Sequence, residues 1–284
     1  MTQPELIPDH PRVLFSDVDG TLIDEEGRLP TAWPMVRRVL EGTLVVLTSS
    51  RTVEELLAIQ HATGIEGPFI AENGALLVLT NEWLDQGHGS VVRAGDRLLR
   101  LLPIGRPETE LRTIIRGAAA ASGVVIETQR SASSADLGGR SGGVAAHALA
   151  RAYSVLVRIA GGAAARLHFF ASLTASGLTV THGGRWHVIQ GGSSKGLAAR
   201  TMLRLIQRRT GRTALAIGVG DGDNDASLLQ VTDVRVAMRL PDGSVHPSLD
   251  ALPELVVPEA PGPEGWPEVL ARLHPVLHGG MVHA

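Results

Sequence analysis

Two aspartates with a spacing suited to chemistry occur near the start of the chain. Asp17 and Asp19 stand two residues apart in "FSDVDGTL", and Gly20 follows them. In an extended strand, side chains two residues apart point to the same face, and the glycine lets the chain turn away sharply. Two carboxylates on one side can serve as nucleophile and general acid/base, or can hold a divalent cation together. A surface turn is the alternative, because Asp-Gly is a common turn dipeptide.

A second acidic cluster closes the segment "GVGDGDND" at 218–225. Asp221 and Asp225 are suited to a hard cation with oxygen ligands, and Mg²⁺ that retains several waters and contacts a substrate phosphate fits this description. A phosphate beside so many carboxylates would be repelled unless cations offset their charge. The sequence therefore predicts a magnesium site that also needs a basic side chain.

Two other binding motifs can be excluded for these clusters. An EF-hand calcium loop needs Gly at position 6 and Glu at position 12, whereas counting from Asp17 gives Leu22 and Arg28, and counting from Asp221 fails in the same way. A dinucleotide-binding loop needs a third glycine where this chain has Asp223.

Lys195 is the single lysine among 26 lysines and arginines, and it lies in "GGSSKGLAAR". A compact ammonium and a planar guanidinium are not interchangeable beside a small anion, so this position is a candidate phosphate contact. "LTSSRT" offers a second one, since Ser49 stands where a strand gives way to a helix and can donate to a phosphoryl oxygen. Compositional drift toward arginine and a plain helix cap are the respective alternatives.

The elements that would position these residues alternate along the chain. Helical spacing at 52–62 and 195–210 separates short apolar runs, and these runs lie at 12–17, 43–50, 68–75 and 213–222. Such alternation predicts an α/β fold with a doubly wound, mostly parallel sheet. The polar clusters follow the runs directly, where the carboxyl ends of parallel strands form a ligand-binding crevice.

The middle of the chain has a different pattern, and we expect it to be an inserted α+β cap domain over 83–186. The catalytic core would then hold 1–82 and 187–284. Within the cap we expect one helix at 107–123, a mobile surface loop at 129–143, and strands at 123–128, 153–159 and 166–170.

Composition limits the class of protein. The chain has 284 residues, 44% of them apolar, a formal charge of −3 and no cysteine. These values predict a globular protein without disulfides or a thiolate nucleophile, and give no general attraction to nucleic acid or to an anionic membrane. The first residues lack the basic and apolar regions of a signal peptide, so we expect a cytoplasmic location.

The ordered set "DVDGT", "TSSR", "SSKG" and "GDGDND" resembles the haloacid dehalogenase superfamily of aspartate-nucleophile phosphotransferases. The resemblance implies a Rossmann-like core of this type with an inserted cap. The segments "SSRTVEE", "AENGA", "ARAYSVLV" and "GGRWHVIQGGSSKGLA" are further similar to the mannosyl-3-phosphoglycerate phosphatases of this superfamily. That narrower resemblance implies Mg²⁺-dependent hydrolysis of the phosphate monoester of mannosyl-3-phosphoglycerate to mannosylglycerate.

The resemblance also assigns roles. Asp17 would be the nucleophile that forms an aspartyl-phosphate, and Asp19 the general acid and base. Ser49 and Lys195 would hold the phosphoryl oxygens. Mg²⁺ would be bound by Asp17, the Asp19 backbone carbonyl, Asp221 and Asp225. The candidate contacts to the rest of the substrate are Arg51, Asn73, Gly74, Arg151, Tyr153, Ser154, Arg185, His187 and Asn224.

Several functions remain compatible with these motifs. A glucosyl-3-phosphoglycerate or general sugar-phosphate phosphatase and a hexose-phosphate mutase would use the same catalytic residues. A binding module without activity is disfavoured because both Asp17 and Asp19 are present. In each active case the partner is a small phosphorylated molecule, and the chain would be a monomer or a homodimer.

Overall fold

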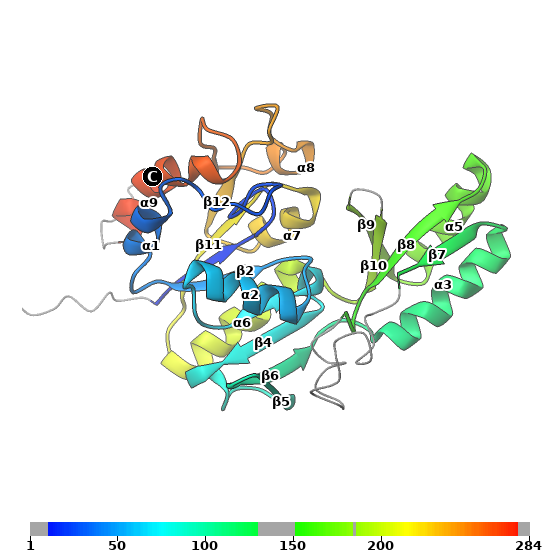
Figure 1. The fold of residues 1–284 in the computed structure, drawn as a ribbon, viewed down its shortest axis with the longest axis horizontal. Coiled ribbons are helices and arrows are strands. Elements are labelled where there is room, and N and C mark those ends of the chain that lie inside the picture. Colours follow the sequence, from blue (N-terminus) through cyan, green and yellow to red (C-terminus); the bar gives the residue numbers. More distant parts are fainter. Residues whose placement is uncertain (1–10, 130–150, 184–185, 278–284) are drawn as a thin grey trace, which may run out of the picture. The chain divides into compact units, whose positions relative to one another are not determined.

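The computed structural model describes residues 11–129, 151–183 and 186–277, and Figure 1 shows their helices and strands. The chain divides into two compact units, one of Met1–Thr48 and Ala199–Ala284 and the other of Ser49–Ala198. Within the described residues, no helix is both long and apolar enough to cross a membrane. The loop expected at 129–143 lies outside the described residues, apart from Gln129.

The first unit contains parallel strands in the order β13-β12-β11-β1-β2. Their apolar runs are almost continuous because both faces of such a sheet are covered. The strands are β1 (Arg12–Ser16), β2 (Leu44–Thr48), β11 (Leu215–Gly220), β12 (Val234–Ala237) and β13 (Leu255–Val256). β1 is central, paired with β2 on one side and β11 on the other, so three of the predicted runs fold as expected.

The helices of this unit connect and cover the parallel strands. α6 begins at Lys195, the position expected from the sequence, and only its residues from Ala199 onward belong to this unit. Among the described residues, the helices and 3-10 turns are α1 (Trp33–Val39), α6 (Lys195–Thr210), η3 (Asp223–Asp225), α7 (Ala226–Leu229), α8 (Pro247–Asp250), η4 (Gly262–Gly265) and α9 (Trp266–Leu277).

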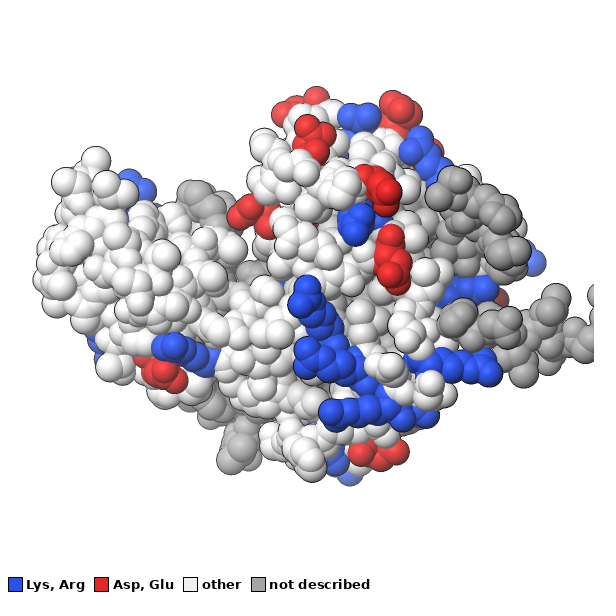
Figure 2. Space-filling view, turned by 180° about the vertical axis from the view of Figure 1, so that it is seen from behind, with Lys and Arg blue, Asp and Glu red and all other residues white. Residues whose placement is uncertain are grey.

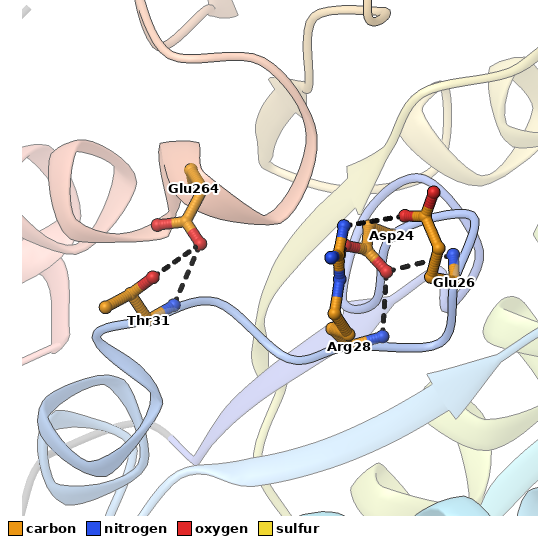
Figure 3. A network of polar contacts seen from close by, with 5 residues as sticks. All are labelled: Asp24, Glu26, Arg28, Thr31 and Glu264. Atoms are coloured by element: carbon orange, nitrogen blue, oxygen red, sulfur yellow. Dashed lines mark hydrogen bonds and ion pairs between the residues drawn. The ribbon is translucent and has the colours of Figure 1, made fainter.

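Side chains within the loop between β1 and α1 hydrogen-bond to the loop itself, and Thr31 at its end hydrogen-bonds to the distant residue Glu264 (Figure 3). The Asp24 carboxylate accepts from the backbone N–H of Glu26 at 3.0 Å and from the Arg28 Nε at 2.7 Å. Further along, one oxygen of Glu264 accepts from both the backbone N–H and the hydroxyl of Thr31, at 2.8 and 3.1 Å. These contacts fix the segment that follows the first acidic motif.

The second unit begins with α2 (Val53–Thr63), whose first turn is held by a reciprocal capping box between Thr52 and Glu55. The antiparallel strands that follow pair in the order β3-β4-β6-β5. They are β3 (Phe69–Ala71), β4 (Leu76–Thr80), β5 (Ser90–Ala94) and β6 (Arg97–Pro103), with the 3-10 turns η1 (Glu72–Gly74) and η2 (Asn81–Trp83). β3 matches the third predicted run.

Between Glu108 and Gly191, the described residues of this unit form a four-stranded antiparallel sheet in the order β7-β8-β10-β9 and the helices α3 and α5 (Figure 1). Its elements are α3 (Glu108–Ser122), β7 (Val125–Thr128), β8 (Val155–Ala160), α5 (Ala163–Ala175), β9 (Leu178–Gly183) and β10 (Trp186–Gly191). One apolar cluster, including Ile115, Val157 and Phe169, joins α3 and α5 to the sheet. This α+β module with its own core is an inserted cap of the expected kind.

The strand predicted at 166–170 is wrong, because these residues form the middle of α5. The run continues from Ala163 to Ala175, and good helix formers flank the two phenylalanines. Phe169 and Leu173 are both fully buried, and a spacing of four residues places them on one helical face. The predicted core and cap boundaries remain expectations. β5 and β6 pair with β4 and not with the four-stranded sheet.

Candidate active site

Three carboxylates gather at the carboxyl ends of the neighbouring strands β1 and β11. Oxygens of Asp17, Asp221 and Asp225 lie within 4.8 Å of one another, and Asp17 and Asp225 are buried. Asp17 directly follows β1, and its backbone N–H continues the ladder by donating to the Val219 carbonyl at 2.9 Å. The parallel register therefore brings together residues more than two hundred positions apart, as the sequence predicted for the two acidic motifs.

Hydrogen bonds orient two of these carboxylates. The Thr21 hydroxyl donates to Asp221 Oδ1 at 3.0 Å. Asp225 Oδ2 accepts from the backbone N–H groups of Asp221 and Gly222, at 3.1 and 3.0 Å. A Cβ at Gly20 would lie 2.4 Å from Asp221 Oδ2. The absence of a side chain there leaves space for the carboxylate.

The cluster fits a hard divalent cation. Its donor atoms are all carboxylate oxygens, which suit Mg²⁺, Ca²⁺ or Mn²⁺ and not the softer metals that prefer thiolate or imidazole ligands. Three like charges held this closely repel one another unless a cation lies among them. Asp17, Asp221 and Asp225 are therefore the residues that would hold the ion.

Asp19 and Asn224 flank the cluster in the same unit. Asp19 is exposed, in contrast to buried Asp17, and its backbone forms an isolated bridge with Ile23 in the turn after β1. An exposed carboxyl group is able to exchange protons with water and with a ligand. Asn224 is the middle residue of η3 and is half-buried.

The second unit assembles the predicted anion-binding residues around the ends of β3 and the start of α6. The Ser49 carbonyl accepts from the Asn73 N–H at 2.9 Å, which joins the loop after β2 to η1. Gly74 has a φ of +91°, and a Cβ there would lie 2.6 Å from the Lys195 backbone nitrogen. Ser49, Asn73, Gly74 and Lys195 thus belong to one packed cluster, in which close backbone approach requires the glycine.

Lys195 differs from the other cations of its helix in burial. It is 1% exposed, whereas α6 also carries the exposed residues Arg200, Arg204 and Arg208 at intervals of four. Figure 2 shows several basic side chains gathered on one face, and these are arginines, since the one lysine is buried. A buried ammonium needs compensating partners, and a phosphoryl group is one of suitable charge.

A buried glutamate connects the remaining predicted contacts. Glu72 Oε2 accepts from the Tyr153 N–H at 3.0 Å and from the Ser154 hydroxyl at 2.6 Å. Arg151 Nη1 donates to the Ser154 hydroxyl at 2.9 Å and to the Ser50 carbonyl at 3.2 Å. Arg51 lies in the same loop, and its carbonyl accepts from the Glu72 N–H at 3.0 Å.

Burial raises the pKa of two of these groups, Glu72 and Tyr153. It raises the pKa of Glu72, while the Ala152 N–H, the Ser154 hydroxyl and the positive charge of Arg151 act in the opposite direction. Burial, and then the negative charge of Glu72, raise the pKa of Tyr153.

Two predicted substrate contacts, His187 and Arg185, are not among the residues that the structure joins around Glu72. His187 lies in β10, in register with Val157 of β8, and its ring meets Phe170 edge-on with ring centres 5.4 Å apart. Arg185 lies outside the described residues. Sequence reasoning assigned no role to Thr21 or Glu72, although each stands within a quoted motif, "DVDGT" and "AENGA". An acidic residue directly after a buried apolar strand was the available signal for Glu72.

Solved structures share this fold. A protein from Thermoplasma acidophilum is 16% identical and has a TM-score of 0.64, with 93% of this chain and 99% of that chain covered. A subclass IIB sugar phosphatase of the HAD superfamily is 15% identical with a TM-score of 0.59 and the same coverage. A phosphatase of the haloalkanoate enzyme superfamily from Bacteroides thetaiotaomicron is 18% identical with a TM-score of 0.61, covering 96% of this chain and 99% of its own.

The sequence itself matches haloacid dehalogenase-like hydrolases over residues 14–88 and 165–246. These ranges include both acidic motifs, Ser49 and Lys195. They cover more than half of the chain. The chain therefore belongs to the haloacid dehalogenase-like hydrolase family.

Proposed function

We propose that the protein is a phosphatase that hydrolyses a phosphate monoester through an aspartyl-phosphate on Asp17. The observation that carries this proposal is the gathering of Asp17, Asp221 and Asp225 within 4.8 Å at the ends of β1 and β11. Family membership supports hydrolysis. A bound Mg²⁺ would supply charge neutralisation between the anionic nucleophile and the anionic substrate.

The chain's own residues account for both chemical steps. In the first, a carboxylate oxygen of Asp17 forms a bond to phosphorus, the bond to the leaving oxygen breaks, and the Asp19 carboxyl group protonates that oxygen. In the second, Asp19 takes a proton from water, whose oxygen attacks phosphorus and releases Asp17 and inorganic phosphate. Using an enzyme carboxylate in this way splits one difficult displacement into two easier ones.

Ser49 and Lys195 would hold the phosphoryl oxygens during both steps. Ser49 follows Thr48, the last residue of β2, by one peptide bond, and β2 is the parallel neighbour of β1. Lys195 is the buried first residue of α6. Positioning and charge neutralisation contribute most of the catalysis in phosphoryl transfer, so these two residues are as important to the proposal as the nucleophile.

For the substrate, we propose a phosphorylated sugar derivative with a second anionic group, of which mannosyl-3-phosphoglycerate is the first candidate. The motif resemblance supports this choice, as do the arginines Arg51 and Arg151 near Ser49, because a guanidinium pairs with a carboxylate through two hydrogen bonds. A fold neighbour is itself described as a sugar phosphatase. Glucosyl-3-phosphoglycerate and simpler sugar phosphates belong in the same substrate panel.

The test is phosphate release by the wild type and by Asp17→Asn, with Mg²⁺ present and after chelation. We expect the wild type to release phosphate only with the cation, and Asp17→Asn to lose at least about a thousandfold in kcat while keeping its circular dichroism spectrum. Glu26→Gln, an exposed change in the nearby loop, is the control. Substantial turnover by folded Asp17→Asn would refute the nucleophile. Transfer of phosphate to the sugar instead of water would identify a mutase.

A further inference from the structure

The catalytic scheme leaves one buried acid of the second unit without a role. Glu72 is fully buried, yet three donors from a single short segment point at its carboxylate. The Ala152 N–H donates to Oε1 at 2.9 Å, the Tyr153 N–H to Oε2 at 3.0 Å, and the Ser154 hydroxyl to Oε2 at 2.6 Å. A buried carboxylate is stable only when such donors satisfy it, so the segment and the acid depend on each other.

The backbone of Glu72 is bound equally firmly to the loop after β2. Its N–H donates to the Arg51 carbonyl at 3.0 Å, and the next N–H, of Asn73, donates to the Ser49 carbonyl at 2.9 Å. Glu72 and Asn73 have φ values of +50° and +53°, in the left-handed region that side chains disfavour. Residues keep such angles where the surroundings impose them, and they occur often at functional sites.

Arg151 completes a ring of contacts. Its Nη1 donates to the hydroxyl of Ser154, the same hydroxyl that donates to Glu72, and also to the carbonyl of Ser50. The guanidinium is therefore held beside the loop of Ser49, the proposed phosphate ligand. Glu72 thus links the loop after β2 to residues 151–154, which are about eighty positions away in sequence.

We propose that Glu72 is a positioning residue for substrate selection: its carboxylate fixes residues 151–154 so that Arg151 binds a second anionic group of the substrate next to the phosphoryl group. The inference rests on the proposed phosphatase function. Glu72 does not touch the reacting atoms. It acts through the orientation of Arg151. The result is a higher kcat/KM for substrates that carry a carboxylate than for those that do not.

The experiment compares two substrates in wild type and Glu72→Gln. Mannosyl-3-phosphoglycerate carries a carboxylate, and p-nitrophenyl phosphate has no second anion. Glutamine keeps the size of the side chain but presents an NH₂ group to donors. We expect kcat/KM for the first substrate to fall about tenfold or more, chiefly through KM, and for the second to change less than about twofold.

Two comparisons separate positioning from general damage. Glu127→Gln removes the same charge from an exposed ion pair with Arg158. It should leave kcat/KM unchanged for both substrates. Arg151→Met should reproduce the selective loss, and the double variant with Glu72→Gln should lose little more, because residues that act through one contact are not additive. Amide exchange at Ala152 and Tyr153 should accelerate in Glu72→Gln. If that variant does not fold, Ser154→Ala interrupts the same contacts with a smaller change.

The outcomes are distinct. If Glu72→Gln lowers kcat/KM equally for both substrates, or for neither, the positioning role is overturned and the phosphatase function stays intact. A wild type that hydrolyses p-nitrophenyl phosphate but shows no preference for the carboxylate-bearing substrate would have the same meaning. A wild type inactive on both would overturn the proposed function, and the positioning role with it.

Discussion

At the scale of single residues, the site depends on which charges are buried. Asp17, Asp225, Glu72 and Lys195 all have little or no exposure. The two aspartates were predictable, because strand ends in a parallel sheet meet at one edge and the motifs follow apolar runs directly. The contacts of Glu72 were not: its place directly after an apolar strand marked it as a polar strand-end residue, but its hydrogen bond with Ser154 joins positions 82 residues apart.

Lys195 provides a prediction that preserves charge. In Lys195→Arg we expect kcat to fall at least about tenfold, because a buried position has little space for the larger planar group, which would displace the proposed phosphate contact. The measurement is steady-state kinetics with the best substrate found. The matched control is Arg204→Lys, an exchange of the same pair of residues at an exposed position of the same helix. Near-normal kcat in Lys195→Arg would mean that only the charge matters there.

At the scale of elements, periodicity predicted the strands β1, β2, β3, β7, β8 and β11 and the helices α2, α3 and α6. It did not predict the remaining elements, and the failures have physical causes. The run at 166–170 is too short to separate an apolar strand from a buried helical face, and the flanking alanines decide for the helix α5. The strands β4, β5 and β6 were not anticipated as an extension of β3. Antiparallel pairing in that region depends on partners that lie elsewhere in the sequence, such as Leu77 opposite Leu102.

The last residue of β11, Gly220, allows a test of how elements shape the proposed metal site. A Cβ at Gly220 would lie 2.4 Å from the Asp225 carboxyl carbon, so Gly220→Ala must displace that carboxylate. We expect the Mg²⁺ concentration for half-maximal activity to rise about tenfold or more. Gly117→Ala is the control: it lies in α3 with open space around it, and should add up to about 1 kcal/mol of stability without changing Mg²⁺ dependence. An unchanged Mg²⁺ requirement in Gly220→Ala would exclude Asp225 from the metal site.

At the scale of the whole molecule, the buried Glu72 makes the free energy of unfolding depend on pH. Burial raises the pKa of Glu72 above its ordinary value of 4.5, so the folded chain retains a proton that the unfolded chain releases as the pH rises through that value. The stabilisation from this group is complete below the unfolded pKa and is lost as the pH rises through the folded pKa. For one proton, the free energy of unfolding can fall by about 1.4 kcal/mol per pH unit.

The corresponding measurement is the free energy of unfolding in urea from pH 4 upward for wild type, Glu72→Gln and Glu127→Gln. We expect the wild type and the exposed control to lose stability with rising pH relative to Glu72→Gln, which has no proton to release at this position. Parallel pH profiles for all three proteins would show that Glu72 has the same pKa in the folded and unfolded chains.

The loop that follows β1 is held by its own side chains and also by residues near the far end of the described chain. The Trp266 indole N–H donates to the Thr21 carbonyl at 2.9 Å across a separation of 245 residues, and Glu264 holds Thr31. Protein synthesis proceeds from the N-terminus, so Asp17 leaves the ribosome long before the residues that secure its loop. β1, which Asp17 directly follows, is thus synthesised well before the residues that later hold the loop beside it.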